Sequence, residues 1–233
     1  FIVEHSPQRI LVTGCAGFIG SNFLRWLFEN NEEVEVIHVD ALTYAGNLEN
    51  IKEILSSPRH RFVKGDIRDS KLINDLVPKV DTVINFAAES HVDRSIDGPK
   101  NFVDTNINGT FNLLEAAKRK VPSIRFVQIS TDEVYGDLGP LDPAFTENSP
   151  YIPSSPYSAS KASSDHLVRA WARTYELPTL LTNCSNNYGP YQFPEKLIPL
   201  VRETFGPDMT LYGDANSSYQ VAKLTRTSTF TSE

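Results

Sequence analysis

The sequence has few cysteines, no long apolar run and no excess of basic residues. Cys15 and Cys184 are the two cysteines of the 233 residues. They form neither a disulfide framework nor a spaced metal cluster, so we expect a reducing compartment and no metal site. No apolar run reaches the roughly 18 residues that a membrane-spanning helix needs. The formal net charge of −7 disfavours non-specific binding to nucleic acid or anionic membranes.

The start of the sequence carries no signal-peptide pattern. Residues 1–7 lack a charged start and a long apolar stretch, and they also lack an initiator Met. We therefore expect a cytoplasmic protein, with residues missing upstream.

The composition, with 40% hydrophobic and 22% charged residues, is typical of a globular protein and excludes disordered, collagen-like and repetitive chains. Short β-branched runs alternate with amphipathic ones. This predicts an α/β fold with a doubly wound parallel sheet, the Rossmann arrangement. The expected strands are 9–13, 34–40, 61–66, 82–87, 124–130 and 178–183. The expected helices are 18–30, 69–77, 99–118, 156–175 and 194–205.

The first expected strand runs into a GxxGxxG loop that opens a helix. Glycines at these positions let the backbone turn tightly and approach a pyrophosphate, which the helix N-terminus then attracts. The expected cofactor contacts in this loop are Gly14, Gly17, Phe18, Ile19 and Gly20. Asp40 ends the second strand, where a carboxylate accepts hydrogen bonds from an adenosine ribose and repels a 2′-phosphate. NAD is therefore favoured over NADP. The alternative is that Asp40 is a solvated residue at the end of a strand and contacts no cofactor.

Two further strand ends supply weaker signals. Asp66 and Ile67 follow the third strand, where Asp66 could meet an adenine amino group; capping the helix that starts near Asp69 is nearly as good an explanation. Ala87 and Ala88 follow the fourth strand. Their small side chains suit either a close approach to the cofactor or plain packing.

Tyr157 and Lys161 form a YxxxK pair. On a helix they share one face, so the ammonium is expected to lower the phenol pKa and make Tyr157 a general base. Alone, such a pair is usually a surface feature. Here it follows a strand ending at Thr131, whose hydroxyl would complete a Thr–Tyr–Lys set.

These motifs resemble the extended short-chain dehydrogenase/reductase superfamily, and within it the dTDP-glucose 4,6-dehydratase family. The resemblance covers residues 8–214 and rests on VTGCAGFIGS, DALTYAGN, FAAESHVDRSI, NING, STDEVYG, PYSASK and NNYGPYQFPEKLIP. It implies bound NAD, further cofactor contacts at Leu42 and Thr43, and a homodimer formed through the helices 99–118 and 156–175.

The resemblance also implies a reaction in three parts. Tyr157 takes the proton of the sugar 4-hydroxyl as hydride leaves C4. Glu133 then removes the C5 proton while Asp132 protonates the departing C6 oxygen, and hydride returns to C6. Adjacent carboxyls can divide these roles when their environments separate their pKa values. The implied substrate contacts are Ser90, Asp93, Thr131, Asn187, Glu195 and Lys196, although a solvated helix start explains the last two equally well.

Three regions follow from this interpretation: an NAD-binding domain at 8–184, the start of a substrate lobe at 185–214, and an irregular tail at 215–233 unlike the family. The substrate lobe is expected to be incomplete and the chain truncated at its C-terminus. A catalytically weak NAD-binding remnant therefore stays open as an alternative, as does an epimerase, decarboxylase or dehydratase acting on another nucleotide sugar. The sequence leaves the nucleotide and the pathway open.

Overall fold

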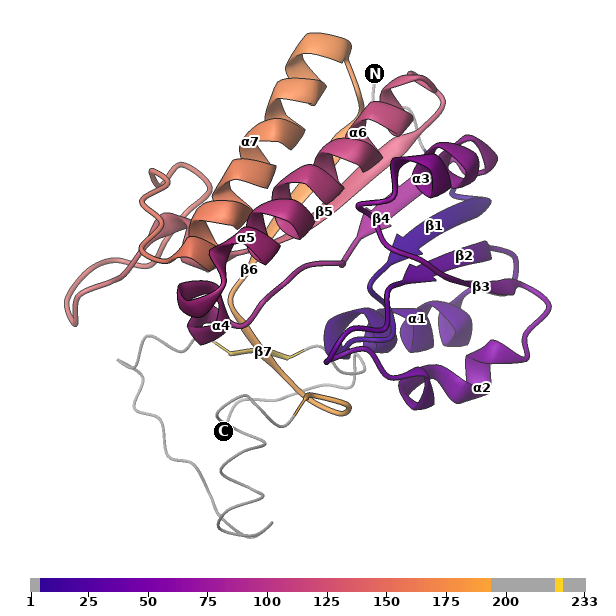
Figure 1. The fold of residues 1–233 in the computed structure, drawn as a ribbon, viewed down its shortest axis with the longest axis horizontal. Helices are drawn as coiled ribbons and strands as arrows, with labels where there is room; N and C mark the ends of the chain where they lie inside the picture. The colour runs from indigo at the N-terminus through magenta and orange to yellow at the C-terminus, as the bar shows by residue number, and fades with distance from the viewer. Residues whose placement is uncertain (1–4, 194–220, 224–233) are drawn as a thin grey trace, which may run out of the picture.

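A computed structural model describes residues 5–193 and 221–223 of the chain. Its main sheet has six parallel strands in the order β3-β2-β1-β4-β5-β6, which confirms the doubly wound arrangement (Figure 1). The strands are β1 (Arg9–Thr13), β2 (Glu35–Asp40), β3 (His60–Lys64), β4 (Thr82–Asn85), β5 (Arg125–Thr131) and β6 (Thr179–Cys184).

The helices lie in two layers. They are α1 (Phe18–Asn30), α2 (Lys52–Leu55), α3 (Ser70–Leu76), α4 (Val92–Asp97), α5 (Pro99–Phe102), α6 (Thr110–Lys118) and α7 (Pro156–Tyr175). A π-helical segment, Val103–Gly109, joins α5 to α6, so the expected helix 99–118 is continuous but not uniformly α-helical. None of the helices in the described part of the chain is long and apolar enough to cross a membrane.

Two apolar clusters hold these layers to the sheet. On the face in front in Figure 1, Leu11 and Phe126 of the sheet pack with α3, α6 and α7. On the opposite face, Ile10 and Val12 pack with α1 and α2. Burying each of these side chains contributes roughly 1.5–3 kcal/mol, so the two clusters supply most of the favourable burial.

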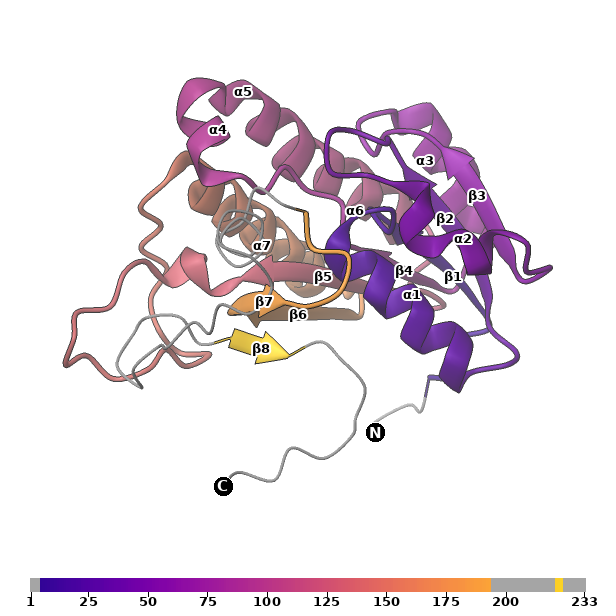
Figure 2. The same ribbon diagram turned by 90° about the horizontal axis from the view of Figure 1, so that it is seen from below.

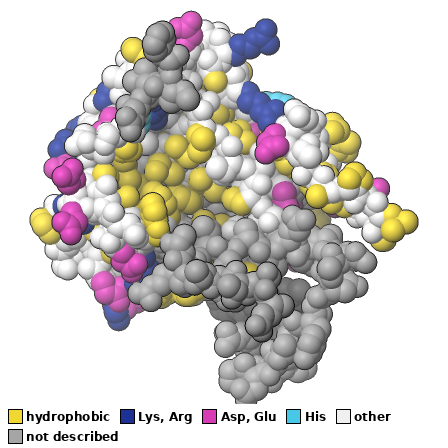
Figure 3. Space-filling view, turned by 180° about the vertical axis from the view of Figure 1, so that it is seen from behind, with side chains coloured by type: hydrophobic (Ala, Val, Ile, Leu, Met, Phe, Trp, Pro, Cys, Tyr) yellow, Lys and Arg dark blue, Asp and Glu magenta, His cyan; other side chains and the backbone are white. Residues whose placement is uncertain are grey.

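The helices of the described residues cover only part of the second face of the sheet. Val127 and Ile129 of β5 are half-buried, while their neighbours Phe126 and Gln128 are buried on the other face. Leu180 of β6 is 57% exposed. Hydrophobic side chains gather across this rear face, bordering the grey atoms (Figure 3).

A second, two-stranded sheet lies beyond β6. There β7 (Asn186–Tyr188) pairs in parallel with β8 (Val221–Lys223), as Figure 2 shows. Within the tail expected to be irregular at 215–233, residues 221–223 are described, and they form β8. The rest of that tail and the expected helix 194–205 lie outside the described residues.

Candidate active site

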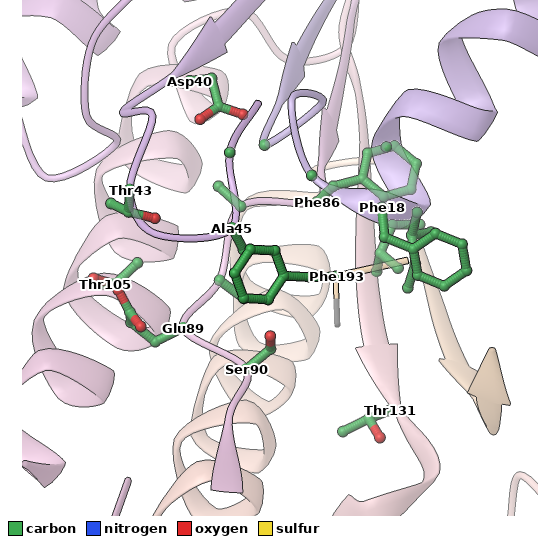
Figure 4. A pocket seen from close by; sticks show the side chains of 18 of the residues that line it. Phe18, Asp40, Thr43, Ala45, Phe86, Glu89, Ser90, Thr105, Thr131 and Phe193 are labelled. Carbon is green, nitrogen blue, oxygen red and sulfur yellow. The ribbon is translucent and has the colours of Figure 1, made fainter. Parts of the chain in front are cut away.

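A cavity of about 960 Å³ lies at the carboxyl ends of the parallel strands (Figure 4). It opens where β1 is flanked by β2 on one side and β4 on the other, the point at which the strand order reverses. Loops leaving neighbouring strands diverge there, which is why doubly wound sheets bind ligands at this point. The glycine loop, Asp40, Thr131, Tyr157 and Lys161 all line the cavity.

The glycine loop is held against the end of β4. Gly14 has φ +73°, and a Cβ on it would lie 2.6 Å from the backbone nitrogen of Ala87. Gly17 is different, since a Cβ there would meet only the carbonyl oxygen of Gly14, at 3.3 Å. Gly17 is also the N-cap of α1, and no side chain caps it. The first-turn N–H groups of α1 therefore remain available to an anionic ligand in the cavity.

Asp40 ties the second strand to this loop. Its carboxylate accepts hydrogen bonds from the backbone N–H groups of Ala16, at 2.9 Å, and Leu42, at 2.8 Å. Leu42 has φ +52° and does not itself line the cavity, whereas Thr43 does. The side chain of Asp40 is 9% exposed, and Nε2 of His38 lies 3.6 Å from it.

Asp66 and Ile67 also line the cavity, but Asp66 does not cap the following helix. That interpretation is wrong, because the N-cap of α3 is Asp69, which accepts from the N–H groups of Lys71 and Leu72. Asp66 instead binds the guanidinium and backbone N–H of Arg68. Burial alone would raise the pKa of Asp66, but these hydrogen bonds outweigh it and lower the pKa.

Ala87, Ala88 and Ser90 form the wall between the two ends of the cavity. This wall is fixed by Asn106, a 2% exposed residue of the π-helical segment. The Asn106 amide exchanges hydrogen bonds with the backbone of Glu89, at 2.8 and 2.9 Å, and donates to Oγ of Ser160, at 2.8 Å. The π-helical segment thereby joins the wall to α7.

Tyr157 and Lys161 lie one turn apart on α7, which Ser155 caps through a capping box. Both are buried, at 8% and 4% exposure. Nζ of Lys161 donates to the carbonyl oxygen of Ile129, at 2.7 Å. This bond ties the lysine to β5, the strand that ends at Thr131.

The pKa of Tyr157 is raised, contrary to the expectation that Lys161 lowers it. Burial is the main cause, and the negative charge of Glu133 adds to it, while hydrogen bonding with Thr131 acts in the opposite direction. Burial also lowers the pKa of Lys161. The phenol therefore retains its proton more strongly in this cavity than in water.

Thr131, Asp132 and Glu133 lie at the end of β5, where the 3₁₀ turn Asp132–Tyr135 begins. Oγ1 of Thr131 accepts from the N–H of Glu133, at 3.2 Å, and caps this turn. Glu133 lines the cavity, whereas Asp132 does not. Burial raises the pKa of Asp132, which favours its protonated form.

One aromatic residue of the cavity lining, Phe193, contacts a second ring, Tyr44, which lies outside the lining. The two rings pack edge-on, with centroids 5.8 Å apart. Arg94 belongs to α4, and its guanidinium lies 3.8 Å from the centre of the Tyr44 ring. Figure 4 shows the Phe193 ring beside Ala45, so segments that follow β2 and β7 meet above the cavity.

Only some of the predicted substrate residues line the cavity. Ser90 and Asn187 line the cavity, while Asp93 is exposed on α4 and does not. Glu195 and Lys196 lie outside the described residues. Three further residues line the cavity without having been predicted: Glu89, Thr105 and Phe193. Glu89 and Phe193 fall within stretches that carry the family resemblance, but neither was given a role, and Thr105 lies outside those stretches.

This fold and this site define a nucleotide-binding protein of the Rossmann type with a Tyr–Lys pair at its cavity. Residues 11–226 match the GDP-mannose 4,6 dehydratase family, so the chain belongs to that family.

Individual relatives fit this assignment. The chain is 57% identical over 219 residues to the dTDP-glucose 4,6-dehydratase of Neisseria meningitidis serogroup B, covering 89% of this chain and 61% of that protein. It is 53% identical over 210 residues to the low-salt glycan biosynthesis protein Agl12 of Haloferax volcanii, covering 89% and 66%. The chain thus spans less than two thirds of the length of these curated relatives.

Solved structures agree in fold. The dTDP-glucose 4,6-dehydratase DesIV from Streptomyces venezuelae, with NAD and TYD bound, has a TM-score of 0.83 and 49% identity, covering 93% of this chain and 68% of its own. The UDP-glucuronic acid 4-epimerase from Bacillus cereus, in complex with UDP-glucuronic acid and NAD, has a TM-score of 0.81 at 29% identity, covering 93% and 69%.

Proposed function

We propose that the chain is the NAD-binding and catalytic part of a dTDP-glucose 4,6-dehydratase, which forms dTDP-4-keto-6-deoxyglucose and water. One observation carries this proposal: Glu133 lines the same cavity as Thr131, Tyr157 and Lys161. Oxidation and re-reduction of one carbon need only the last three residues. A carboxylate facing the Tyr–Lys pair adds the base that an elimination requires.

The residues present fit NAD. Gly17 leaves room for a pyrophosphate, and the uncapped start of α1 offers N–H groups to it. Gly14, Phe18, Ile19 and Gly20 would complete this contact, and Asp40 would hold the adenosine ribose. Asp66 and Ile67 would face the adenine, with Thr43, Ala87 and Ala88 along the groove. When bound, NAD supplies the hydride acceptor of the first step and the hydride donor of the last.

In the oxidation, Tyr157 accepts the proton of the sugar 4-hydroxyl. Because burial raises its pKa, the phenol needs a positive charge beside it, and we assign this charge to Lys161. Hydrogen bonding with Thr131 opposes the effect of burial on the pKa of Tyr157. These residues hold and move one proton at one oxygen atom.

In the elimination, a ketone at C4 makes the C5 proton acidic. Glu133 removes that proton, and Asp132 protonates the oxygen that leaves C6. When C6 then accepts hydride, Glu133 returns the proton to C5. The raised pKa of Asp132 supports the acid role, because burial shifts this carboxyl toward its protonated form. Since Asp132 does not line the cavity here, this role requires a turn of its side chain when the sugar binds.

The substrate contacts that we propose within the described residues are Ser90 and Asn187. The aromatic cover formed by Phe193 and Tyr44 supports retention of NAD through the cycle, because their edge-on contact would hinder release of the cofactor past Phe193. Both cysteines are free thiols, which suits the cytoplasm.

We further propose a homodimer through α6, α7 and the π-helical segment. Val103 and Phe111 are 44% and 42% exposed, and the Phe111 ring packs edge-on against Trp171, at 5.8 Å. Figure 1 shows α6 and α7 side by side in the outer layer. Light scattering tests this: Phe111→Glu should shift the protein from dimer to monomer, and an unchanged mass would exclude this surface.

The proposed activity is tested by incubation with dTDP-glucose and detection of the 4-keto product. UDP-glucose and CDP-glucose serve as matched substrates that differ only in the nucleotide. Turnover with release of water supports the proposal. Bound NAD without turnover would reduce the chain to an NAD-binding remnant, and 4-epimerisation without elimination would make it an epimerase.

A further inference from the structure

A buried carboxylate lies behind the Tyr–Lys pair and has no role in the reaction described above. Asp165 is on α7, one turn beyond Lys161, and is 0% exposed. Its Oδ2 accepts hydrogen bonds from Oγ of Ser130, at 2.7 Å, the hydroxyl of Tyr151, at 3.1 Å, and Nδ2 of Asn183, at 3.2 Å. Burial of such a group costs several kcal/mol unless a charge or hydrogen bonds compensate it.

The partners of Asp165 belong to elements that end at the site. Ser130 directly precedes Thr131 in β5. Asn183 of β6 also donates to the carbonyl oxygen of Thr131, at 3.2 Å. Asp165 therefore connects α7 to the strand end that carries Thr131.

The second carboxylate oxygen is in a different position. Oδ1 of Asp165 is buried and has no hydrogen-bond partner within the described part of the chain. Burial raises the pKa of Asp165, and the charge of Lys161 is the first of the influences that lower it again. The effect is mutual, because Asp165 is the first charge that raises the pKa of Lys161 against burial.

The hydrogen bond of Lys161 does not offset the cost of burying its charge as a carboxylate would. Its Nζ donates to the carbonyl oxygen of Ile129, a neutral acceptor. A backbone carbonyl stabilises an ammonium less than a carboxylate does. The charge that compensates Lys161 therefore comes from the next turn of its own helix.

We propose that Asp165 is a positioning residue that keeps Lys161 protonated and thereby directs a positive charge at Tyr157. This inference rests on the proposed function, in which Tyr157 must lose its proton. Its basis is geometric: Lys161 and Asp165 are both buried at i and i+4 on one helix, three donors hold Oδ2 of Asp165, and its Oδ1 has no hydrogen-bond partner in the described part of the chain. A purely structural Asp165 would need only the three hydrogen bonds.

Other titratable groups face this network. Burial raises the pKa of Tyr151 to about 12, and also that of Tyr135, so both remain neutral hydroxyls near pH 7. Arg169 donates to the hydroxyl of Tyr151, at 3.0 Å, and the His166 ring packs against Tyr151, with centroids 5.2 Å apart. Sγ of Cys184 donates to the carbonyl oxygen of Ser130, at 3.3 Å. On the Tyr157 side, the charged groups are Asp132 and Glu133.

The test compares Asp165→Asn with Tyr151→Phe. The asparagine keeps the shape and can accept the three hydrogen bonds through its amide oxygen, but it lacks the charge. The phenylalanine removes one of those hydrogen bonds and keeps the charge. The titration of Lys161 is followed by NMR of protein labelled with ¹³C-lysine, with the signal assigned from Lys161→Arg.

Asp165→Asn should lower the titration midpoint of Lys161 by at least about one pH unit, a tenfold change in proton affinity. Near neutral pH, kcat should fall about tenfold or more, while KM and NAD content stay within about twofold. Tyr151→Phe should leave the Lys161 midpoint in place. An unchanged midpoint in Asp165→Asn would overturn the proposal.

Two further measurements distinguish failure of this inference from failure of the proposed function and from misfolding of a variant. If the unmodified protein binds NAD without turnover, the proposed function fails, yet the Lys161 titration still decides the role of Asp165. If Asp165→Asn does not fold, Lys161→Met provides the reciprocal measurement, because coupling between two sites is mutual. The Asp165 carboxyl, followed in ¹³C-aspartate-labelled protein, should then titrate at higher pH, and an unchanged midpoint would equally overturn the proposal.

Discussion

Two glycines of one loop should respond to alanine in opposite ways. In Gly14→Ala, the added Cβ would lie 2.6 Å from the nitrogen and 2.7 Å from the Cα of Ala87, both backbone atoms that cannot rotate away. The backbone there also has φ +73°, which disfavours any L side chain. In Gly17→Ala, φ is −81° and the Cβ meets one oxygen at 3.3 Å, with the cavity beyond it.

The magnitudes differ accordingly. For Gly14→Ala, the positive φ costs about 1–2 kcal/mol and the overlap a further ~1–3 kcal/mol, against a gain of about 0.4–1 kcal/mol from a stiffer unfolded chain. We expect a net loss of roughly 2–4 kcal/mol in the free energy of unfolding, a large part of the ~5–15 kcal/mol of a typical domain. For Gly17→Ala, we expect a change within about 1 kcal/mol, because a poorer N-cap offsets the same gain.

Gly17→Ala, the variant that we expect to keep its stability, should be the one that loses affinity for NAD. The methyl group of Gly17→Ala would occupy the space proposed for the pyrophosphate, so NAD affinity should fall at least about 100-fold, or about 2.8 kcal/mol. Urea unfolding followed by circular dichroism gives the stabilities, and calorimetric titration with NAD gives the affinities. The reasoning is refuted if Gly14→Ala is as stable as Gly17→Ala, or if Gly17→Ala binds NAD with unchanged affinity.

Three further predictions concern single residues. Glu133→Gln should slow dehydration by about 10²–10⁴-fold without loss of NAD, because the amide cannot accept the C5 proton; product analysis and NAD content check this, and normal dehydration would contradict the role. Phe193→Ala should speed NAD dissociation about tenfold in stopped-flow fluorescence, since Tyr44 loses its ring partner; an unchanged rate would exclude the aromatic cover as a barrier. Burial, followed by the charge of His38, lowers the pKa of His60 to about 4, whereas an unfolded histidine titrates near about 6.5. The unfolded chain thus binds more protons in this window, and the free energy of unfolding should fall by up to about 3 kcal/mol between pH 6.5 and 4. His60→Leu should flatten this dependence in urea unfolding, and an equally steep curve in the variant would show that other groups cause it.

The sequence predicts the long elements well because their ends carry chemical signals. The structure gives 18–30 and 156–175 the predicted bounds, since glycine precedes the first helix and Ser155 and Pro156 start the second. The short helices α2 and α4 were missed, because four and six residues are too few to establish a periodicity. The pairing of β7 with β8 depends on segments more than thirty residues apart, which no local pattern records.

The candidate site was predicted through its motifs, but its electrostatics were not. Spacing alone puts Tyr157 and Lys161 on one face of a helix. It cannot show that both are buried, and burial is what raises the phenol pKa. Asp165 was overlooked for the same reason: the spacing of four that joins Tyr157 to Lys161 repeats from Lys161 to Asp165, yet only the folded structure shows that this carboxylate is not on the surface.

The contact between Gly14 and Ala87 also has a consequence for biosynthesis. The glycine loop takes its shape against a strand end that is made roughly 70 residues later, which at about 5–20 residues per second is a delay of roughly 4–15 seconds. Until β4 has emerged and paired with β1, the loop has no wall to fold against, and the proposed NAD site is not yet formed. The nascent chain must therefore pair β1 with β4 without help from the cofactor. NAD, bound as we propose, would stabilise only chains in which β4 already pairs with β1.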